Sequence, residues 1–153
     1  MVLAFFDAGG LIYSNIVPKG TAVNSAYILK ALRNFMKKLR QKRPRLAEQG
    51  FVFHWDNAPV HTAAVVRDWF TANAIQRLEH PPYSPDLAPA DFFLFPHVKE
   101  ALAGHTLTAD SLKTPWDGVT ATITKEAFAV AFEKWYERCL KCIELKGNYV
   151  EKS

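Results

Sequence analysis

The chain has 153 residues, of which 49% are hydrophobic, 13% aromatic and 22% charged, with a formal net charge of +4. This composition is typical of a globular protein and excludes disorder along the whole chain. No stretch approaches the roughly eighteen apolar residues of a membrane span, and the apolar start is too short for a signal peptide. The length suits one domain, which we expect to cover residues 1–153.

Two short apolar runs at the start of the chain predict a β-hairpin. Residues 2–6 and 11–17 are the strand-like runs, and Asp7 with Gly9 and Gly10 supplies the turn between them. The hairpin leads into a loop that begins with a proline, which ends the second strand.

A basic helix is predicted next, capped by Asn24 or Ser25 and ended by Pro44. Its apolar residues, among them Ile28 and Leu32, recur at helical spacing. Between residues 30 and 45 there are eight basic residues and no acidic one. Such a surface is either a solvated helix face or a face that contacts DNA phosphates, and both interpretations stay open. The eight candidate DNA-binding residues are Lys30, Arg33, Lys37, Lys38, Arg40, Lys42, Arg43 and Arg45.

The central part of the chain predicts a strand, a helix and a second short strand. Residues 51–55 are bulky and apolar and indicate a buried strand, which runs into a turn at residues 56–59, Asp-Asn-Ala-Pro. A helix is expected to begin at His61 or Thr62, and residues 75–78 form a brief strand. Strands that alternate with helices in this order predict a mixed α/β domain.

The remaining part of the chain is predicted to be mainly helical. Residues 81–89 are dense in proline, and we expect a loop there without helix or central strand. A helix follows from about residue 92 to 103, with Asp91 as its cap or first residue. The structure of residues 105–124 is ambiguous, whereas residues 125–145 show the apolar periodicity of an amphipathic helix.

Two cysteines, Cys139 and Cys142, lie three positions apart in the predicted last helix. This spacing is found in redox pairs and in half of a zinc site. A zinc site needs four ligands, and no second pair stands at suitable spacing. We therefore expect two reduced cysteines, as in an intracellular protein.

Two carboxylates, Asp56 and Asp91, are the candidate catalytic residues. Each alone is typical of a structural role, as a turn residue or a helix cap. Thirty-four residues separate them, and the helix, strand and loop in between can return the chain to the same edge of a sheet. Two carboxylates that converge there could hold Mg²⁺, which prefers oxygen ligands. Pairs of such ions clamp the attacking and leaving oxygens of a phosphoryl transfer.

The sequence around both carboxylates resembles the mariner-type transposases of the DDE/D superfamily. Residues 53–62, Phe-His-Trp-Asp-Asn-Ala-Pro-Val-His-Thr, resemble the block around the family's second catalytic aspartate. Residues 80–95, His-Pro-Pro-Tyr-Ser-Pro-Asp-Leu-Ala-Pro-Ala-Asp-Phe-Phe-Leu-Phe, are similar to its third block almost residue for residue. Residues 6–10 resemble the hairpin after the first catalytic strand, and residues 142–152 resemble the family's C-terminal end. The resemblance covers essentially the whole chain.

The resemblance implies an α/β fold of the RNase H-like type, a mixed sheet with flanking helices. It implies Asp56 and Asp91 as catalytic metal ligands, Mg²⁺ or Mn²⁺ as the cofactor, DNA as the partner and the nucleus as the location. In the family, a metal-dependent hydrolysis at a transposon end is followed by attack of the new 3′-OH on target DNA.

One catalytic element of the family is not found in this sequence. The first catalytic aspartate lies on the strand before the hairpin, and no Gly-Asp-Glu element precedes Met1. We therefore expect weak metal binding, two unpaired sheet edges and low stability of an isolated monomer.

Three hypotheses for the function remain. The first and favoured one is a transposase-derived fragment that binds nucleic acid but is inactive alone. The second is an active transposase or endonuclease that upstream sequence or a partner chain completes. The third is a domesticated module for DNA docking or for dimerisation with a second copy.

Overall fold

The computed structural model describes residues 1–144. They fall into two compact units, of which the first comprises Met1–Phe5 and Ile12–Pro82. The second comprises Phe6–Leu11 and the chain from Tyr83 onward. The predicted family-like segment at residues 142–152 lies largely outside the described residues.

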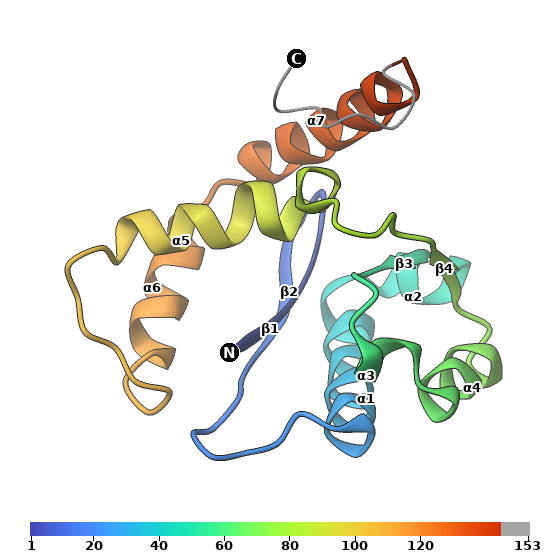
Figure 1. Cartoon of the computed structure of the whole chain (residues 1–153), viewed down its shortest axis with the longest axis horizontal. Coiled ribbons are helices and arrows are strands. Elements are labelled where there is room, and N and C mark those ends of the chain that lie inside the picture. Colours follow the sequence, from blue (N-terminus) through green and yellow to red (C-terminus); the bar gives the residue numbers. More distant parts are fainter. Residues whose placement is uncertain (145–153) are drawn as a thin grey trace. The chain divides into compact units, whose positions relative to one another are not determined.

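The chain begins with the predicted hairpin. β1 (Val2–Asp7) and β2 (Gly10–Ile16) form a two-stranded sheet (Figure 1). Oδ1 of Asp7 accepts a hydrogen bond from the backbone N–H of Gly9 at 2.9 Å. Gly10 has a φ of 122°, a conformation that side chains with a Cβ rarely adopt. Asp7 is thus a turn residue, as the sequence predicts.

Helix α1 (Ser25–Lys42) supplies much of the core of the first unit. Asn24 caps it as predicted, because its side chain accepts a hydrogen bond from the N–H of Tyr27 at 2.9 Å. Pro44 does more than end this helix: it also opens a short one, α2 (Pro44–Gln49), since proline suits the first turn. One face of α1 is buried, and its residues are Ile28, Ala31, Leu32, Phe35 and Leu39.

A second two-stranded sheet follows α2. β3 (Val52–His54) pairs in parallel with β4 (Gln76–Leu78). Parallel strands need a crossover connection, and helices α3 (Pro59–Thr62) and α4 (Ala64–Ala72) provide it. The sequence predicts one helix here. The structure has two, because Ala63 adopts an extended backbone with φ −58° and ψ 143°.

Aromatic side chains from both sheets pack against α1. The ring of Phe5 on β1 stacks on Phe35 of α1 with a centroid distance of 4.7 Å. Phe53 on β3 lies 6.0 Å from Phe5 and 5.1 Å from Phe70 of α4. Within the described residues, however, β1 and β3 belong to separate sheets. Among the described residues, each of these two-stranded sheets therefore has edges without a strand partner.

The second unit is mainly helical. A single 3₁₀ turn, η1 (Pro85–Leu87), lies within the proline-rich loop, where no helix was expected. A π-helical turn, η2 (Ala90–Leu94), continues directly into α5 (Phe95–Ala101). Helices α6 (Lys113–Thr122) and α7 (Lys125–Glu144) complete the unit (Figure 1). None of the helices between residues 1 and 144 is long and apolar enough to span a membrane.

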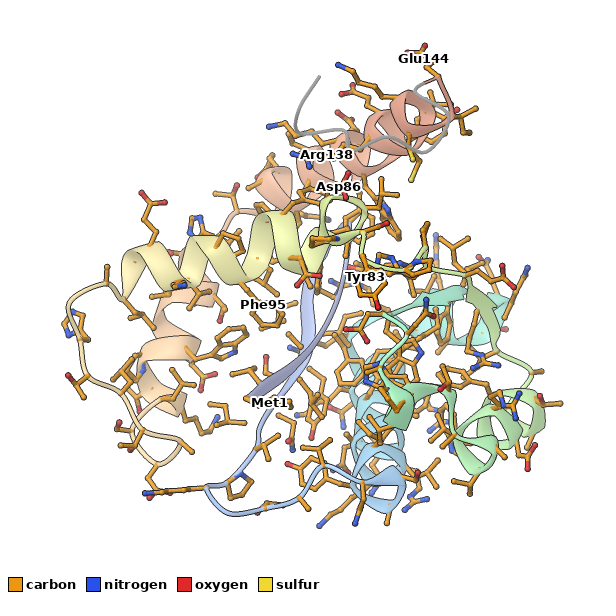
Figure 2. The ribbon with its side chains drawn as sticks, in the orientation of Figure 1. Met1, Tyr83, Asp86, Phe95, Arg138 and Glu144 are labelled. Atoms are coloured by element: carbon orange, nitrogen blue, oxygen red, sulfur yellow. The ribbon has the colours of Figure 1, made fainter. Side chains whose placement is uncertain are left out.

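Helix α7 is joined to η1 through Arg138, which lies beside Asp86 in Figure 2. The Arg138 guanidinium donates a hydrogen bond to the backbone oxygen of Asp86 at 3.2 Å. It also lies 4.4 Å from the ring centroid of Phe92, where the negative face of the ring attracts it. Asp86 is only 3% exposed. It is therefore an anchored residue of the loop.

Candidate active site around Asp56

Asp56 lies directly after β3, at the start of the Asp-Asn-Ala-Pro turn. Its Oδ1 accepts a hydrogen bond from the backbone N–H of Ala58 at 3.1 Å, which fixes the local turn. The same oxygen lies 2.8 Å from Nδ1 of His61, and the Asp56 side chain is 57% exposed. Within residues 1–144, Oδ2 makes no hydrogen bond. One carboxylate oxygen thus shapes the turn, and the other is available to a ligand.

Asn57 ties this turn to the end of β4. Its Nδ2 donates a hydrogen bond to the carbonyl oxygen of His80 at 2.5 Å. The His80 ring is buried, and its Nδ1 lies 3.0 Å from Nε2 of His54. One of these two nitrogens carries the proton and the other accepts it. Two contacts to the same histidine therefore hold the turn beside the parallel strand pair.

His54 is kept uncharged at neutral pH by its surroundings. Burial is the main cause that lowers its pKa from 6.5 to about 4, the neighbouring His80 lowers it further, and Asp56 acts in the opposite direction. A neutral His54 ring can both donate and accept a hydrogen bond, which suits its contact with the second histidine.

We expect His54 to make the stability of the chain depend on pH between about 6.5 and 4. In this range the unfolded chain binds a proton at His54 and the folded protein does not, so the free energy of unfolding falls as the pH falls. Above this range neither state is protonated at His54, and below it both are, so the contribution levels off. Urea unfolding of the wild type and His54→Gln at a series of pH values tests this. The variant should show a flatter profile, and identical profiles would contradict the expectation.

A cavity of about 370 Å³ opens beside Asp56 and lies wholly within the first unit. Its polar wall includes Asp56, His61 and Glu79, and Trp55 and Phe70 contribute apolar surface. In the described part of the chain, no three His, Cys, Asp or Glu side chains form a metal-binding group. A Mg²⁺ ion that keeps most of its water needs only one or two carboxylates. The free oxygen of Asp56 suits such an ion as one ligand of an incomplete site.

Asp91 belongs to the second unit, where it is exposed in the first turn of η2. Pro89 occupies the cap position and Ala90 begins η2, so Asp91 is the second residue of this segment and neither caps nor begins it. Its backbone N–H donates to the carbonyl oxygen of Ala88 at 2.9 Å. A carboxylate in the first turn of a helix is stabilised by the positive end of the helix dipole. That Asp56 and Asp91 share a metal ion stays a prediction.

Seven of the eight basic residues predicted to contact DNA are exposed, and Arg43 is half-buried. Four of them, Lys30, Arg33, Lys37 and Arg40, recur three or four positions apart and form one stripe along α1, which we call the basic stripe. The helical spacing places the stripe opposite the buried face of α1. Among residues 1–144, none of the four forms an ion pair. Their charges are therefore free to contact phosphates.

Comparisons with known proteins show the family. No protein-family model matches the chain. The mariner Mos1 transposase of Drosophila mauritiana is 35% identical over 154 residues, which cover 99% of this chain and 45% of the relative. The solved Mos1 catalytic domain with raltegravir and Mg has a TM-score of 0.91 at 34% identity, over 97% of this chain and 75% of that one. The Mos1 paired-end complex with the left transposon end has a TM-score of 0.89 at 35% identity. The match covers 97% of this chain and 44% of that one.

The matched structures define an RNase H-like catalytic domain, as predicted from the two aspartate blocks. The chain belongs to the mariner transposase family. The chain spans 45% of the length of the Mos1 transposase. It therefore corresponds to less than half of the protein that carries out transposition.

Proposed function

We propose that this chain is a DNA-binding part of a mariner-type transposase catalytic domain that does not cleave DNA when it acts alone. The observation that carries the proposal is its likeness to the Mos1 catalytic domain, with a TM-score of 0.91 at 34% identity. That structure contains Mg, and the Mos1 paired-end complex contains a transposon end. Both support DNA phosphate as the target. A nuclear location is part of the proposal, because chromosomal DNA lies there.

Asp56 and Asp91 are the proposed metal ligands. For Asp56, support comes from its geometry: Ala58 and His61 engage Oδ1, and Oδ2 is left to bind an ion. For Asp91, support comes from its sequence block and its exposed position at the start of η2. Mg²⁺ or Mn²⁺ bound there would polarise the oxygens of a phosphodiester. The role of Asn57 and His80 is to hold the Asp56 turn in place.

The basic stripe on α1 is the proposed contact with the DNA backbone. Lysine and arginine that neutralise phosphates release bound counterions, and this release drives binding without regard to base sequence. The stripe suits this role because its charges are exposed and free of ion pairs within residues 1–144. Binding of this kind requires no metal.

Cleavage is proposed to need a third carboxylate from upstream sequence or from a partner chain. The sequence supplies the two family blocks around Asp56 and Asp91. Two carboxylates hold a pair of divalent ions poorly, because bound cations are the largest charges in such sites and need matching ligands. The alternative of an active enzyme has the same requirement for a third ligand.

Incubation with supercoiled plasmid and Mn²⁺ tests the absence of cleavage. We compare the wild-type chain with Asp56→Ala and with Asp68→Ala, an exposed carboxylate of α4 that is not in the cavity wall. All three proteins are expected to leave the plasmid nicked only at the background rate. Nicking by the wild type and Asp68→Ala that Asp56→Ala loses would show an active metal-dependent nuclease and overturn this part of the proposal.

A further inference from the structure

We infer that His61 is a positioning residue for Asp56: its Nδ1 donates a hydrogen bond to the Asp56 backbone oxygen and lies 2.8 Å from Oδ1, and these contacts orient the carboxylate to present Oδ2 to a divalent metal ion. The inference rests on the proposed function, because it concerns the same site.

The contact geometry fixes the direction of the hydrogen bond. Nδ1 of His61 lies 2.8 Å from Oδ1 of Asp56 and 3.3 Å from the backbone carbonyl oxygen of the same residue. A carboxylate oxygen and a carbonyl oxygen are both acceptors, so Nδ1 must carry the proton.

The His61 ring is itself held in place from the core. It stacks on Trp55 with a centroid distance of 3.9 Å and an interplanar angle of 4°. Trp55 in turn makes edge contacts with Phe53 at 5.0 Å and Phe70 at 5.4 Å. The His61 side chain is only 14% exposed. A row of packed rings therefore connects the core to the Asp56 carboxylate and limits the freedom of the donor.

Closing the turn does not need the His61 contact. The hydrogen bond from the Ala58 N–H to Asp56 and the hydrogen bond from Asn57 to His80 already fix the backbone. What His61 adds is a ring nitrogen 2.8 Å from the same carboxylate oxygen, and this contact restricts rotation of the carboxyl group. Outer hydrogen-bond partners of this kind orient metal ligands, and their loss typically weakens metal binding about tenfold or more.

Two substitutions separate the donor from the stacked ring. His61→Phe keeps a flat ring against Trp55 and removes the donor. His61→Asn keeps an N–H donor near the position of Nδ1 and removes most of the stacking. His105→Phe is the matched control, because His105 is an exposed histidine of the second unit.

The test is the dissociation constant for Mn²⁺, measured on the full chain from the EPR signal of free Mn²⁺. We expect His61→Phe to bind Mn²⁺ roughly tenfold more weakly than the wild type, His61→Asn to recover most of the loss, and His105→Phe to match the wild type. Circular dichroism verifies that each variant is folded.

Each contrary result has its own meaning. Wild-type affinity in His61→Phe, together with a loss in Asp56→Asn, would overturn the role of His61 and leave the proposed function standing. Equal weakening in His61→Phe and His61→Asn would also overturn it, because the donor would then have no separate effect. Equal binding by the wild type and Asp56→Asn would overturn both the proposed metal ligand and the inference.

Discussion

Replacement of Lys30, Arg33, Lys37 and Arg40 by glutamine is expected to weaken binding to duplex DNA on the order of a hundredfold to a thousandfold at low salt. These four residues form the basic stripe, are exposed and lie opposite the buried face of α1. Each lost phosphate contact makes the slope of log K against log salt less negative by about 0.9. If all four residues contact phosphates, the slope should become less negative by roughly 3 to 4. Fluorescence anisotropy with a labelled duplex at several KCl concentrations measures both quantities.

A matched variant separates the basic stripe from the net charge of the protein. Glutamine at Lys99, Lys125, Lys134 and Lys141 removes the same charge from exposed positions of the second unit. This control should bind DNA nearly as the wild type does. Wild-type binding by the stripe variant would mean that the stripe is only a solvated helix face. Equal losses in both variants would mean that overall charge, and no particular surface, attracts the DNA.

The elements that the sequence predicts well are those with a complete local signal. The hairpin has two apolar runs and a turn in which Asp7 bonds to Gly9. Helix α1 has a capping residue, Asn24, and apolar residues at helical spacing. The short strand before Asp56 is marked by bulky apolar residues and ends at a turn sequence. In each case neighbours in the chain carry all the information that is needed.

The differences between the predicted and the observed elements arise mainly where one residue type serves two roles. Proline at position 44 is compatible with the end of one helix and with the first turn of the next, and here it does both. Pro85 likewise opens a 3₁₀ turn in a loop where proline was expected to exclude helix. The break at Ala63 has no composition signal, because alanine is a good helix former. The extended backbone of Ala63, with a ψ of 143°, separates α3 from α4.

In the candidate site, too, local sequence predicts some residues and misses contacts between distant ones. Asp56 is predictable, because its turn sequence and family block surround it. The pairing of His54 with His80 is not, because it joins residues 26 positions apart through the parallel strands. The sequence predicts His61 only as a possible first residue of a helix. Its contact with Asp56 depends on α3, which returns the chain over the turn so that the ring stacks on Trp55.

Asparagine at Asp56 is expected to remove most of the Mn²⁺ affinity of the site around the Asp-Asn-Ala-Pro turn. A weakly held ion that keeps several waters depends on its few carboxylate ligands. The loss should therefore exceed the roughly tenfold effect of removing an outer hydrogen-bond partner. Asp68→Asn, which removes an exposed carboxylate of α4 that is not in the cavity wall, is the matched control and should bind as the wild type does.

The central claim about the site is that Asp56 binds a divalent metal ion, and paramagnetic broadening of amide NMR signals by Mn²⁺ tests it most directly. The amide signals of Asn57 and Ala58, which follow Asp56 in the turn, should weaken as Mn²⁺ is added. Asp56→Asn should protect both signals, and Asp68→Asn should not. Broadening at Asn57 and Ala58 that Asp56→Asn leaves unchanged would contradict the claim.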